Sequence, residues 1–338
     1  MVHAIRTVDA HAGGHPLRLI VDGIPSPAGR TILQKREWLR RHADHLRRAL
    51  VLEPRGHAGM IAALLTESAS PEAHAGLVFM DASGYPAMSG HGVMAAATLA
   101  IERGLFFSRE DTDSEARLVF DTPAGTVHAH VRLQARGNDI RRADEVAVAN
   151  VPSFVHTAGH PVRVGSRSMR VDVAFGGVFY AIVDTEAAGI PLTRERVPEL
   201  RRLGIEVRES IGADFDVDHP TARALNGVDG VIFTGPPRDP EAHLLNVAVT
   251  GGAVRRCPSG TATAALMAVL DAMGLLQDDQ TFVSESLTGA LFRGRIARRT
   301  EIGDRPAIVP EVTGAAWITG EHTFLLNDDD PFREGFAF

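Results

Sequence analysis

Two short segments of the chain combine residue types that could bind an anion and move a proton. Residues 89–92 read Ser-Gly-His-Gly, and residues 259–262 read Ser-Gly-Thr-Ala. Each segment leads into a run of Ala, Leu, Met and Val, so each Ser is expected at the N-terminus of a buried helix. Backbone N–H groups at a helix N-terminus favour an anion, and a glycine in the first turn lets a carboxylate come close. The pattern therefore predicts a clamp for one small carboxylate, with candidate substrate-binding residues Gly90, His91, Gly260 and Thr261.

The two serines are also candidates for proton transfer. A hydroxyl beside a bound carboxylate lies near the adjacent carbon, which is the atom that loses its proton in many reactions of amino acids. Ser89 and Ser259 are therefore candidate catalytic residues. His91 is a third, because an imidazole that accepts the Ser89 proton would make that hydroxyl more basic. The alternative is that each Ser only caps its helix, a contribution of about 1 kcal/mol. The occurrence of two matched segments favours the catalytic interpretation.

The helices that would carry these residues are predicted over 89–103 and 259–273. Each Ser lies 15 residues before a glycine, Gly104 or Gly274, that is suited to end the helix. The serines are 170 residues apart in a chain of 338, so the spacing indicates two halves of similar architecture. We expect an N-terminal half and a C-terminal half, with a C-terminal tail that could cross back to the first half; the predicted halves are 1–152 and 153–338.

Most of the remaining sequence predicts β-strands. Short β-branched or alternating runs separated by Gly and Pro are typical of strands and turns, and the segment DTPAGT between two such runs predicts a hairpin. Together with the two apolar helices, the runs predict an α/β (α+β) fold in which each half is a curved sheet around one central helix. The predicted strands lie near residues 2, 16, 76, 116–133, 169, 177, 230, 243 and 291.

Composition and charge exclude several classes of function. The chain holds 35 Lys and Arg against 42 Asp and Glu, a formal charge of −7, and no stretch gathers the basic residues that nucleic acid requires. No run of 18 apolar residues appears, and the first 19 residues lack the apolar centre of a signal peptide. We therefore expect a cytoplasmic protein that binds neither nucleic acid nor membrane.

No cofactor or metal is expected. The single Lys, Lys35, lies in a predicted surface helix over 31–50 and is expected on its solvated face, which argues against a pyridoxal phosphate Schiff base. The nucleotide-binding patterns GxxxxGK[ST] and GxGxxG are absent. The single Cys, Cys257, excludes a disulfide within the chain and a Cys-based zinc site. His128 and His130 share a strand face, but no third ligand lies near them, so a structural role is expected.

A set of motifs along nearly the whole chain resembles the proline racemase family, which includes proline racemase, hydroxyproline 2-epimerase and trans-3-hydroxy-L-proline dehydratase. Any one of the motifs would be weak evidence, but together they are specific. They are DAHAGG at 9–14 followed by Pro16 and Arg18, EPRGHAGM at 53–60, MSGHG at 88–92, NVPSF at 150–154, FGGVFYAIV at 175–183, PSGT at 258–261 and AWITGEH at 316–322.

The resemblance implies a cofactor-free fold similar to diaminopimelate epimerase, with two mostly antiparallel halves and an active site in the cleft between their central helices. In the racemases two Cys residues occupy the helix starts and exchange the α-proton on opposite faces. This chain has Ser89 and Ser259 there, and a hydroxyl is far harder to ionise than a thiol, which excludes efficient two-thiol racemisation. The second Cys is a Thr in the dehydratase branch, so a hydroxyl at 259 fits elimination better than racemisation.

A second departure from the family is Arg255. The family commonly has an Asp there that resembles a partner for the ring ammonium of the substrate, and an Arg would repel that group. Arg255 is nevertheless a candidate substrate-binding position. A replacement charge could come from the segment ADFDVDHP, and Cys257 could reach the site, although a small buried Cys in a turn is the simpler interpretation. Structural roles in turns are expected for Asp9, His11 and His57. The candidate replacement residues are Asp214, Asp216, Asp218 and His219.

The sequence thus favours a lyase that dehydrates trans-3-hydroxy-L-proline to 1-pyrroline-2-carboxylate with Ser89, His91 and Ser259. An isomerase of the same family, a hydroxyproline 2-epimerase or proline racemase, is the first alternative. The second is a non-catalytic amino-acid-binding paralogue that kept the carboxylate clamp. The expected partner is a small amino acid of the proline or hydroxyproline type, and a homodimer is left open.

Overall fold

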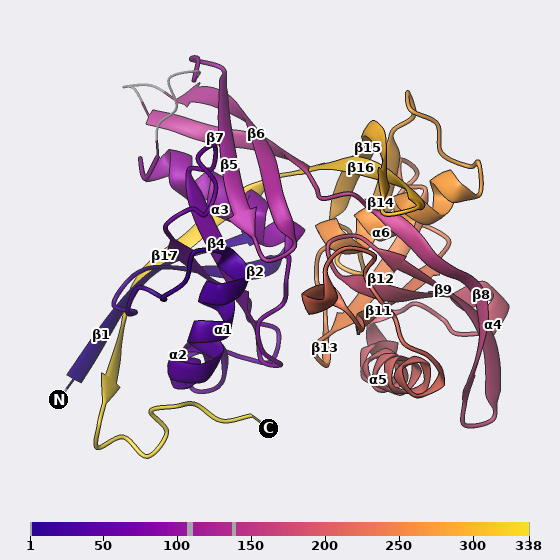
Figure 1. Ribbon diagram of the computed structural model, residues 1–338, viewed down its shortest axis with the longest axis horizontal. Helices are drawn as coiled ribbons and strands as arrows, with labels where there is room; N and C mark the ends of the chain where they lie inside the picture. Colours follow the sequence, from indigo (N-terminus) through magenta and orange to yellow (C-terminus); the bar gives the residue numbers. More distant parts are fainter. Residues whose placement is uncertain (1, 107–110, 137–139, 338) are drawn as a thin grey trace. The chain divides into compact units, whose positions relative to one another are not determined.

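A computed structural model describes residues 2–106, 111–136 and 140–337, with the side chains of 135, 136, 140 and 141 left out. The chain divides into two compact units, one formed by residues 1–148 and 314–338 and the other by residues 149–313 (Figure 1). We call them unit 1 and unit 2. The predicted mixed α/β fold is confirmed, because the described residues of both units form strands together with fewer helices.

Unit 1 is a curved sheet around one helix. Strand β1 pairs antiparallel with β17 and β2, β2 is parallel to β3, β3 is antiparallel to β4, β4 is parallel to β5, and β5 and β6 form the expected hairpin. Helix α3 contacts strands from both ends of this order, β17 and β6, so the sheet curves around it. The elements are β1 Val2–Ala12, β2 His15–Asp22, α1 Ile32–His42, α2 Asp44–Val51, β3 Ala62–Thr66, β4 Ala75–Met80, α3 Gly90–Glu102, β5 Glu115–Thr122, β6 Gly125–Arg136, β7 Ile140–Ala149 and β17 Ala316–Asn327.

Unit 2 repeats the same order of pairings. Strand β9 is antiparallel to β8 and β10, β10 is parallel to β11, β11 is antiparallel to β12, β12 is parallel to β14, and β14 is antiparallel to β15. The predicted similarity of the two halves is therefore confirmed at the level of topology. The elements are β8 Phe154–Val164, β9 Arg167–Phe175, β10 Phe179–Asp184, α4 Thr185–Ala188, α5 Val197–Asp214, β11 Val228–Gly235, β12 Leu244–Thr250, β13 Ala253–Val254, α6 Gly260–Ala272, β14 Phe282–Glu285, β15 Leu291–Ile302 and β16 Arg305–Gly314, with short 3-10 turns at Arg194–Arg196 and Arg223–Leu225.

The two central helices are buried as expected from their composition. Every residue of α3 from Gly90 to Ile101 is buried, and so is α6 from Gly260 to Val269. Ala, Thr and Gly dominate both helices, so the strands can approach from several sides. Both helices are followed by a left-handed glycine, Gly104 with φ 61° and Gly274 with φ 71°, which confirms the predicted ends.

The prediction of one surface helix over 31–50 is wrong. The chain forms α1 and α2 with a break at Ala43, whose φ of −137° and ψ of 19° are not helical. The predicted solvated position of Lys35 is also wrong, since only 4% of this residue is exposed. Ile32, Lys35 and Leu39 lie on one face of α1, which packs on the sheet, and the Lys35 ammonium donates to the Glu67 carbonyl at 2.6 Å. Its long alkyl stem is buried and its charged end reaches a carbonyl group.

Helix α5 lies outside the sequence prediction, although its pattern carries the signal of an amphipathic helix. Leu200, Leu203, Val207 and Ile211 recur at three- and four-residue spacings, and all are buried. The helix packs on β8, β11 and β12 of unit 2.

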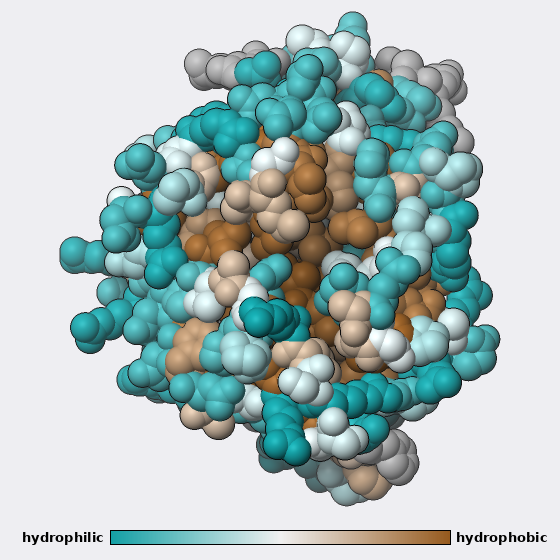
Figure 2. Space-filling view, turned by 90° about the vertical axis from the view of Figure 1, so that its right-hand side faces the viewer, coloured by the Kyte–Doolittle hydropathy of each residue, from teal (hydrophilic) through white to brown (hydrophobic). Residues whose placement is uncertain are grey.

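Unit 2 also holds a cavity of about 1000 Å³ beside the C-terminal half of α6. Its apolar lining includes Ile182, Leu266, Val269 and Leu270. Figure 2 shows hydrophobic side chains gathered in a hollow of the face that it presents. Within the described part of the chain, no helix is long and apolar enough to span a membrane, and no group of three or more His, Cys, Asp or Glu side chains could hold a metal ion.

Candidate active site

Ser89 lies at the N-terminus of α3 beside His91. Its backbone is extended, with φ −147° and ψ 99°, and within the described chain its side chain caps no backbone N–H of α3. The Ser89 Oγ instead lies 3.2 Å from the His91 Nδ1. Both residues are buried, with 6% and 3% of their surface exposed. The hydroxyl is therefore directed to an imidazole nitrogen and not to the helix backbone.

The geometry also requires the glycine that directly follows His91. A Cβ at Gly92 would lie 2.7 Å from the Phe79 ring and 2.9 Å from the Ser89 Oγ. Such contacts are shorter than ordinary van der Waals separations, so any larger residue would displace the Ser89 hydroxyl. Gly92 thus keeps space for the side chain on which the predicted chemistry depends.

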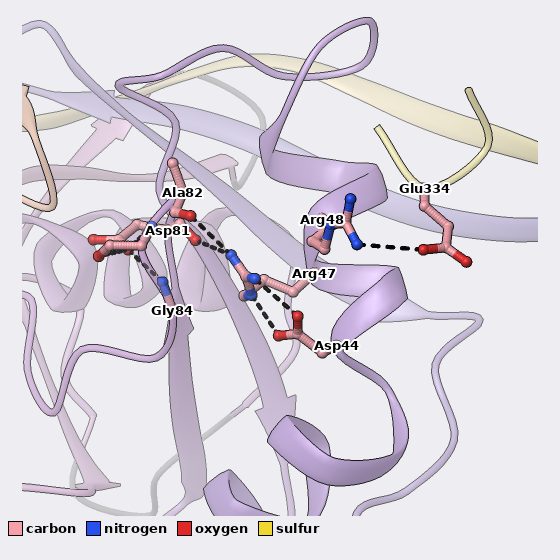
Figure 3. A network of polar contacts seen from close by, with 8 residues as sticks. Asp44, Arg47, Arg48, Asp81, Ala82, Gly84 and Glu334 are labelled. Carbon is pink, nitrogen blue, oxygen red and sulfur yellow. Dashed lines mark hydrogen bonds and ion pairs between the residues drawn. The ribbon is translucent and has the colours of Figure 1, made fainter. Parts of the chain in front are cut away.

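The loop that leads into Ser89 is anchored by Arg47 of α2 (Figure 3). The Arg47 guanidinium forms two hydrogen bonds to the Asp44 carboxylate, at 2.7 and 2.9 Å, and donates to the carbonyls of Asp81 and Ala82. The Asp81 carboxylate accepts the backbone N–H groups of Ser83 and Gly84, which closes the turn. Helix α2 therefore fixes the start of the segment between β4 and α3.

His15 is a neighbour of His91 that the sequence pattern does not identify. It is fully buried at the start of β2, and its ring meets the His91 ring edge to face, with centroids 4.7 Å apart and an interplanar angle of 74°. Residue spacing gives no signal for this contact, because β2 and α3 are brought together only by the folding of the sheet around the helix. His15 restricts the orientation of the His91 ring.

Ser259 stands in a strained backbone conformation. With φ 58° and ψ 117°, it is the one non-glycine residue with positive φ in the described ranges. Its Oγ accepts the Ala262 N–H at 3.4 Å and lies 3.2 Å from the Thr261 Oγ1. Positive φ in a non-glycine residue costs of order 1–3 kcal/mol and is concentrated at functional sites. Ser259 is thus held where its hydroxyl meets a second hydroxyl.

A third hydroxyl, from Tyr180 of β10, continues this contact. The Tyr180 hydroxyl lies 2.9 Å from the Thr261 Oγ1, and both residues are buried, with 2% and 3% of their surface exposed. Sequence reasoning does not single out Tyr180, because its link to Thr261 spans 81 residues. Unit 2 therefore contains a chain of three hydroxyls, Tyr180, Thr261 and Ser259.

The first turn of α6 is pressed against the turn after β9. A Cβ at Gly176 would lie 2.1 Å from the Thr261 carbonyl oxygen and 2.7 Å from the Ala265 nitrogen. The Asn150 side-chain amide donates to the Gly176 carbonyl at 2.8 Å and holds this turn. Glycine is the residue that permits such an approach, so the position of the Ser259 helix start depends on it.

Cys257 is unsuited to act as a base. It is 1% exposed, and burial raises the pKa of its thiol to about 11. The Ser259 N–H donates to its sulfur at 3.4 Å. The expectation of a small buried Cys in a turn agrees with this environment, in which the thiol stays protonated at neutral pH.

The candidate charged residues of unit 2 have partners of their own. Arg255 is 8% exposed, and its backbone N–H donates to the Ala248 carbonyl at 2.8 Å. Asp214 pairs with His160 at 3.4 Å, and Asp218 accepts from the Asn226 side chain. His219 packs against Phe154, Phe175 and Phe179, and burial lowers its pKa. The replacement of the ring-ammonium partner by these acids stays a prediction.

Of the residues expected in turns, two hold turns and one does not. His11 and His57 each accept a backbone N–H through Nδ1, from Gly14 at 3.3 Å and Gly59 at 3.1 Å. His11 and Asp9 lie within β1. Asp9 forms a buried ion pair with Arg18 at 2.8 Å, because the two residues face each other across the β1–β2 pairing. On β6, His128 and His130 are exposed.

The structure thus brings the predicted site residues together in two groups. In unit 1 the Ser89 hydroxyl has an imidazole beside it, which can accept a proton. In unit 2 the Ser259 hydroxyl accepts the Ala262 N–H, and the side chain beside it among the contacts described is the Thr261 hydroxyl, which is followed by that of Tyr180. At neutral pH hydroxyls are far better proton donors than bases. The two serines are alike in sequence but differ in their chemical surroundings.

Solved structures of distant sequence have the same class of fold as this chain. A methylitaconate-delta-isomerase and a PhzF-family phenazine biosynthesis protein from Bacillus anthracis have the same fold, with TM-scores of 0.52 and 0.55 at 13% and 12% identity. The chain belongs to the proline racemase family, whose model, described as "Proline racemase", matches residues 7–337.

Similar relatives within this family carry different activities. The chain is 38% identical to a proline racemase of Acetoanaerobium sticklandii over 98% of both chains, and 38% identical to a trans-3-hydroxy-L-proline dehydratase of Bacillus cereus over 98% of this chain and 97% of the relative. It is also 38% identical to a 3-hydroxyproline 2-epimerase of Burkholderia multivorans over 98% of both chains. A hydroxyproline epimerase from Agrobacterium vitis with bound trans-4-hydroxy-L-proline has a TM-score of 0.91 at 29% identity, covering 99% of this chain and 95% of that one. The family therefore contains both isomerases and a lyase.

Proposed function

We propose that the protein is a lyase that dehydrates a hydroxyproline-like amino acid, with trans-3-hydroxy-L-proline as substrate and 1-pyrroline-2-carboxylate as product. The observation that carries this proposal is the difference between the two serines. Ser89 lies 3.2 Å from an imidazole nitrogen, whereas Ser259 lies 3.2 Å from another hydroxyl. Elimination in one direction needs one base and one acid. Racemisation needs two groups that exchange these roles, which an unequal pair suits poorly.

The proposed reaction assigns one role to each serine. Ser89, with His91 as proton acceptor, removes the proton from Cα, and the electron pair of that bond forms a double bond to C3. The C3–O bond breaks, and the leaving hydroxyl takes a proton from Ser259 and departs as water. The enamine product then tautomerises to the imine, so the net change is loss of one water molecule.

Substrate recognition is assigned to the first turns of the two central helices. The backbone N–H groups near Gly90 and Gly260 suit a carboxylate, because the helix dipole and the missing side chains both favour an anion there. His91 and Thr261 complete the proposed contacts. Arg255, in place of the Asp of the family, disfavours a cation at this position and is expected to alter the range of accepted amino acids.

The test is a time course by NMR in D2O with trans-3-hydroxy-L-proline, trans-4-hydroxy-L-proline and L-proline in separate samples. Formation of the pyrroline product from the first compound supports the proposal. Deuterium at Cα with inversion and without elimination would establish the epimerase, the alternative favoured by the hydroxyproline epimerase of similar structure. Thermal stabilisation by these amino acids without turnover or exchange would indicate a binding protein.

Matched variants test the roles of the unit 1 residues. Ser89→Ala and His91→Gln should each lower product formation and Cα exchange by a factor of about 100 or more, the usual contribution of acid–base catalysis. His128→Gln is the control, because His128 is exposed on β6 and should leave both rates unchanged. Equal rates for His91→Gln and the wild type would refute the assignment of the base.

A further inference from the structure

The row of hydroxyls in unit 2 includes one, that of Tyr180, to which the proposed dehydration assigns no role. Three buried hydroxyls follow one another from β10 to the start of α6, with oxygen–oxygen distances of 2.9 Å between Tyr180 and Thr261 and 3.2 Å between Thr261 and Ser259. Tyr180 lies farthest from the expected chemistry. We propose that Tyr180 is a positioning residue that acts through Thr261 to make Ser259 a proton donor; this inference rests on the dehydration proposed above.

The direction of the hydrogen bonds supports this role. The Ala262 N–H donates to the Ser259 Oγ, which uses one lone pair of that oxygen. If Tyr180 donates to Thr261 and Thr261 donates to Ser259, both lone pairs of the Ser259 oxygen are occupied and its own proton points elsewhere. That proton is then available to a bound ligand. Without the Tyr180 hydroxyl, Thr261 has no fixed donor behind it, and Ser259 can turn its proton to Thr261 instead.

The fold holds Tyr180 and Thr261 firmly enough to set this direction. Gly230 gives room for the Tyr180 ring, since a Cβ there would lie 3.2 Å from the ring edge. Gly176 lets the turn after β9 press on the Thr261 carbonyl, and Ser259, whose φ is positive, places its Oγ 3.2 Å from the Thr261 Oγ1. The three oxygens are therefore placed by the backbone of two strands and one helix.

When the C3 hydroxyl leaves, the proton transfers leave the negative charge on the Tyr180 phenol oxygen. As the C3–O bond breaks with its electron pair on oxygen, the leaving hydroxyl takes the Ser259 proton and becomes water. The Ser259 oxygen takes the Thr261 proton, and the Thr261 oxygen takes the Tyr180 proton. A phenol is the most acidic of these hydroxyl types, so it is the group best able to carry the charge. The proton taken from Cα by Ser89 and His91 exchanges with solvent, and Tyr180 is reprotonated from solvent before the next turnover.

The experiment separates elimination from proton abstraction in D2O with trans-3-hydroxy-L-proline. In Tyr180→Phe the Cα proton still leaves but the hydroxyl departs slowly, so deuterium accumulates at Cα of the remaining substrate. We expect product formation to fall at least tenfold and the ratio of deuterated substrate to product to rise at least tenfold. Thr261→Val should behave in the same way, and Thr261→Ser, which keeps the hydroxyl, should recover most of the wild-type ratio.

The control is Tyr85→Phe, because Tyr85 is the other tyrosine of the chain and lies in unit 1 beside Arg47. It should leave the ratio unchanged. A merely structural role for Tyr180 would lower elimination and exchange in parallel, and that result, or unchanged product formation, would overturn the inference. If Tyr180→Phe does not fold, the Thr261→Val and Thr261→Ser pair decides. Failure of the proposed function is distinguishable, since the wild type would then give no pyrroline product, with or without deuterated substrate, and the role of Tyr180 would fall with it.

Discussion

At the scale of single residues, the same side chain acquires different chemistry from its neighbours. Ser89 and Ser259 open equivalent helices, yet one faces an imidazole and the other a row of hydroxyls. An imidazole is a proton acceptor near neutral pH, whereas an isolated serine is not. The geometry around each serine therefore supports the proposed assignment of one as base and the other as acid, where the sequence shows two identical residues.

Cys257 provides a residue-scale prediction that depends on pH. Burial raises the pKa of its thiol from 9.0 to about 11. Between these values the unfolded chain loses the thiol proton while the folded chain keeps it, so stability is complete below about pH 9 and declines as the pH rises toward 11. The loss should approach roughly 2–3 kcal/mol, at 1.36 kcal/mol per pKa unit.

The measurement is urea unfolding of the wild type and of Cys257→Ala at pH 7, 9 and 10.5. As the pH rises, the free energy of unfolding of the wild type should fall relative to that of the variant. Alkylation of Cys257 by iodoacetamide at pH 8 should be slow in the folded protein and fast in the unfolded protein. The variant should keep the wild-type rates of exchange and elimination. Rapid alkylation of the folded protein would contradict the raised pKa.

The sequence identifies the two serines and His91 by type and spacing, but it cannot identify Tyr180 or His15. Those residues lie on β10 and β2 and reach the helix starts only because each sheet curves around its helix. Periodicity reports which face of an element is buried and not which distant element covers it. The error at Lys35 has a different cause: its charge leads to an expectation of solvent exposure, although its helix position places it on the buried face.

At the scale of elements, the segment before α3 is held by one arginine. The Arg47 side chain is 9% exposed and binds Asp44 and two carbonyl groups, whereas the neighbouring Arg48 is 43% exposed and reaches Glu334 at 3.5 Å. Arg47→Ala should destabilise the protein by about 3 kcal/mol, because it leaves buried acceptors without a donor. Arg48→Ala is the matched control and should cost less than about 1 kcal/mol.

Chemical denaturation of both variants checks this prediction, and pH provides a second signature. The hydrogen bond from Arg47 lowers the pKa of the Asp44 carboxyl below its ordinary value of 3.8. The contribution of the pair is therefore complete above pH 3.8 and is lost as the pH falls through the lowered value. The gap between wild type and Arg47→Ala should narrow under acid conditions. Equal costs for the two arginines would refute the anchoring role.

A glycine pair tests the contact that places α6. Gly176→Ala would bring a Cβ to 2.1 Å from the Thr261 carbonyl, so the first turn of α6 must shift. We expect a loss of about 2 kcal/mol or more and a drop in elimination. Gly212→Ala is the control, since Gly212 is exposed in α5 with open space around it, and it should stabilise by about 0.5–1 kcal/mol. Thermal unfolding and product formation measure both effects, and a harmless Gly176→Ala would show that the close contact is not required.

The elements differ in how far their sequences specify them. The central helices and most strands carry clear apolar patterns, because each is buried on at least one face. The break between α1 and α2 at Ala43 has no Gly or Pro to mark it, so the sequence predicts one continuous helix. The matched helix starts predict two similar halves. They do not predict which strands pair, because those pairings join segments that are far apart in the chain.

At the scale of the whole molecule, unit 1 depends on the last segment of the chain. Strand β17 pairs with β1 along its whole length, from Val2 opposite Asn327 to Ala12 opposite Ala316. It also contacts α3, and its Phe324 ring stacks on the Arg18 guanidinium at 4.2 Å. Unit 2 consists of one continuous segment, 149–313, and contains no part of this strand. Removal of β17 should therefore affect the two units unequally.

We expect deletion of residues 316–338 to expose β1 and to release α3, with loss of hydrogen-exchange protection over β1, β2 and Ser89–His91. Protection in β10–β12 and α6 of unit 2 should persist, because their partners all remain. Deletion of 328–338 is the matched control: it removes the contacts of the tail, which include the Arg48–Glu334 and Arg55–Asp330 ion pairs and the Glu53–Phe336 bridge, so increased exchange should be limited to the region near residues 48–55. Hydrogen exchange read by mass spectrometry measures both. Equal loss of protection in both units after the longer deletion would show that unit 2 cannot keep its structure without an intact unit 1, because the deletion removes none of its own strands.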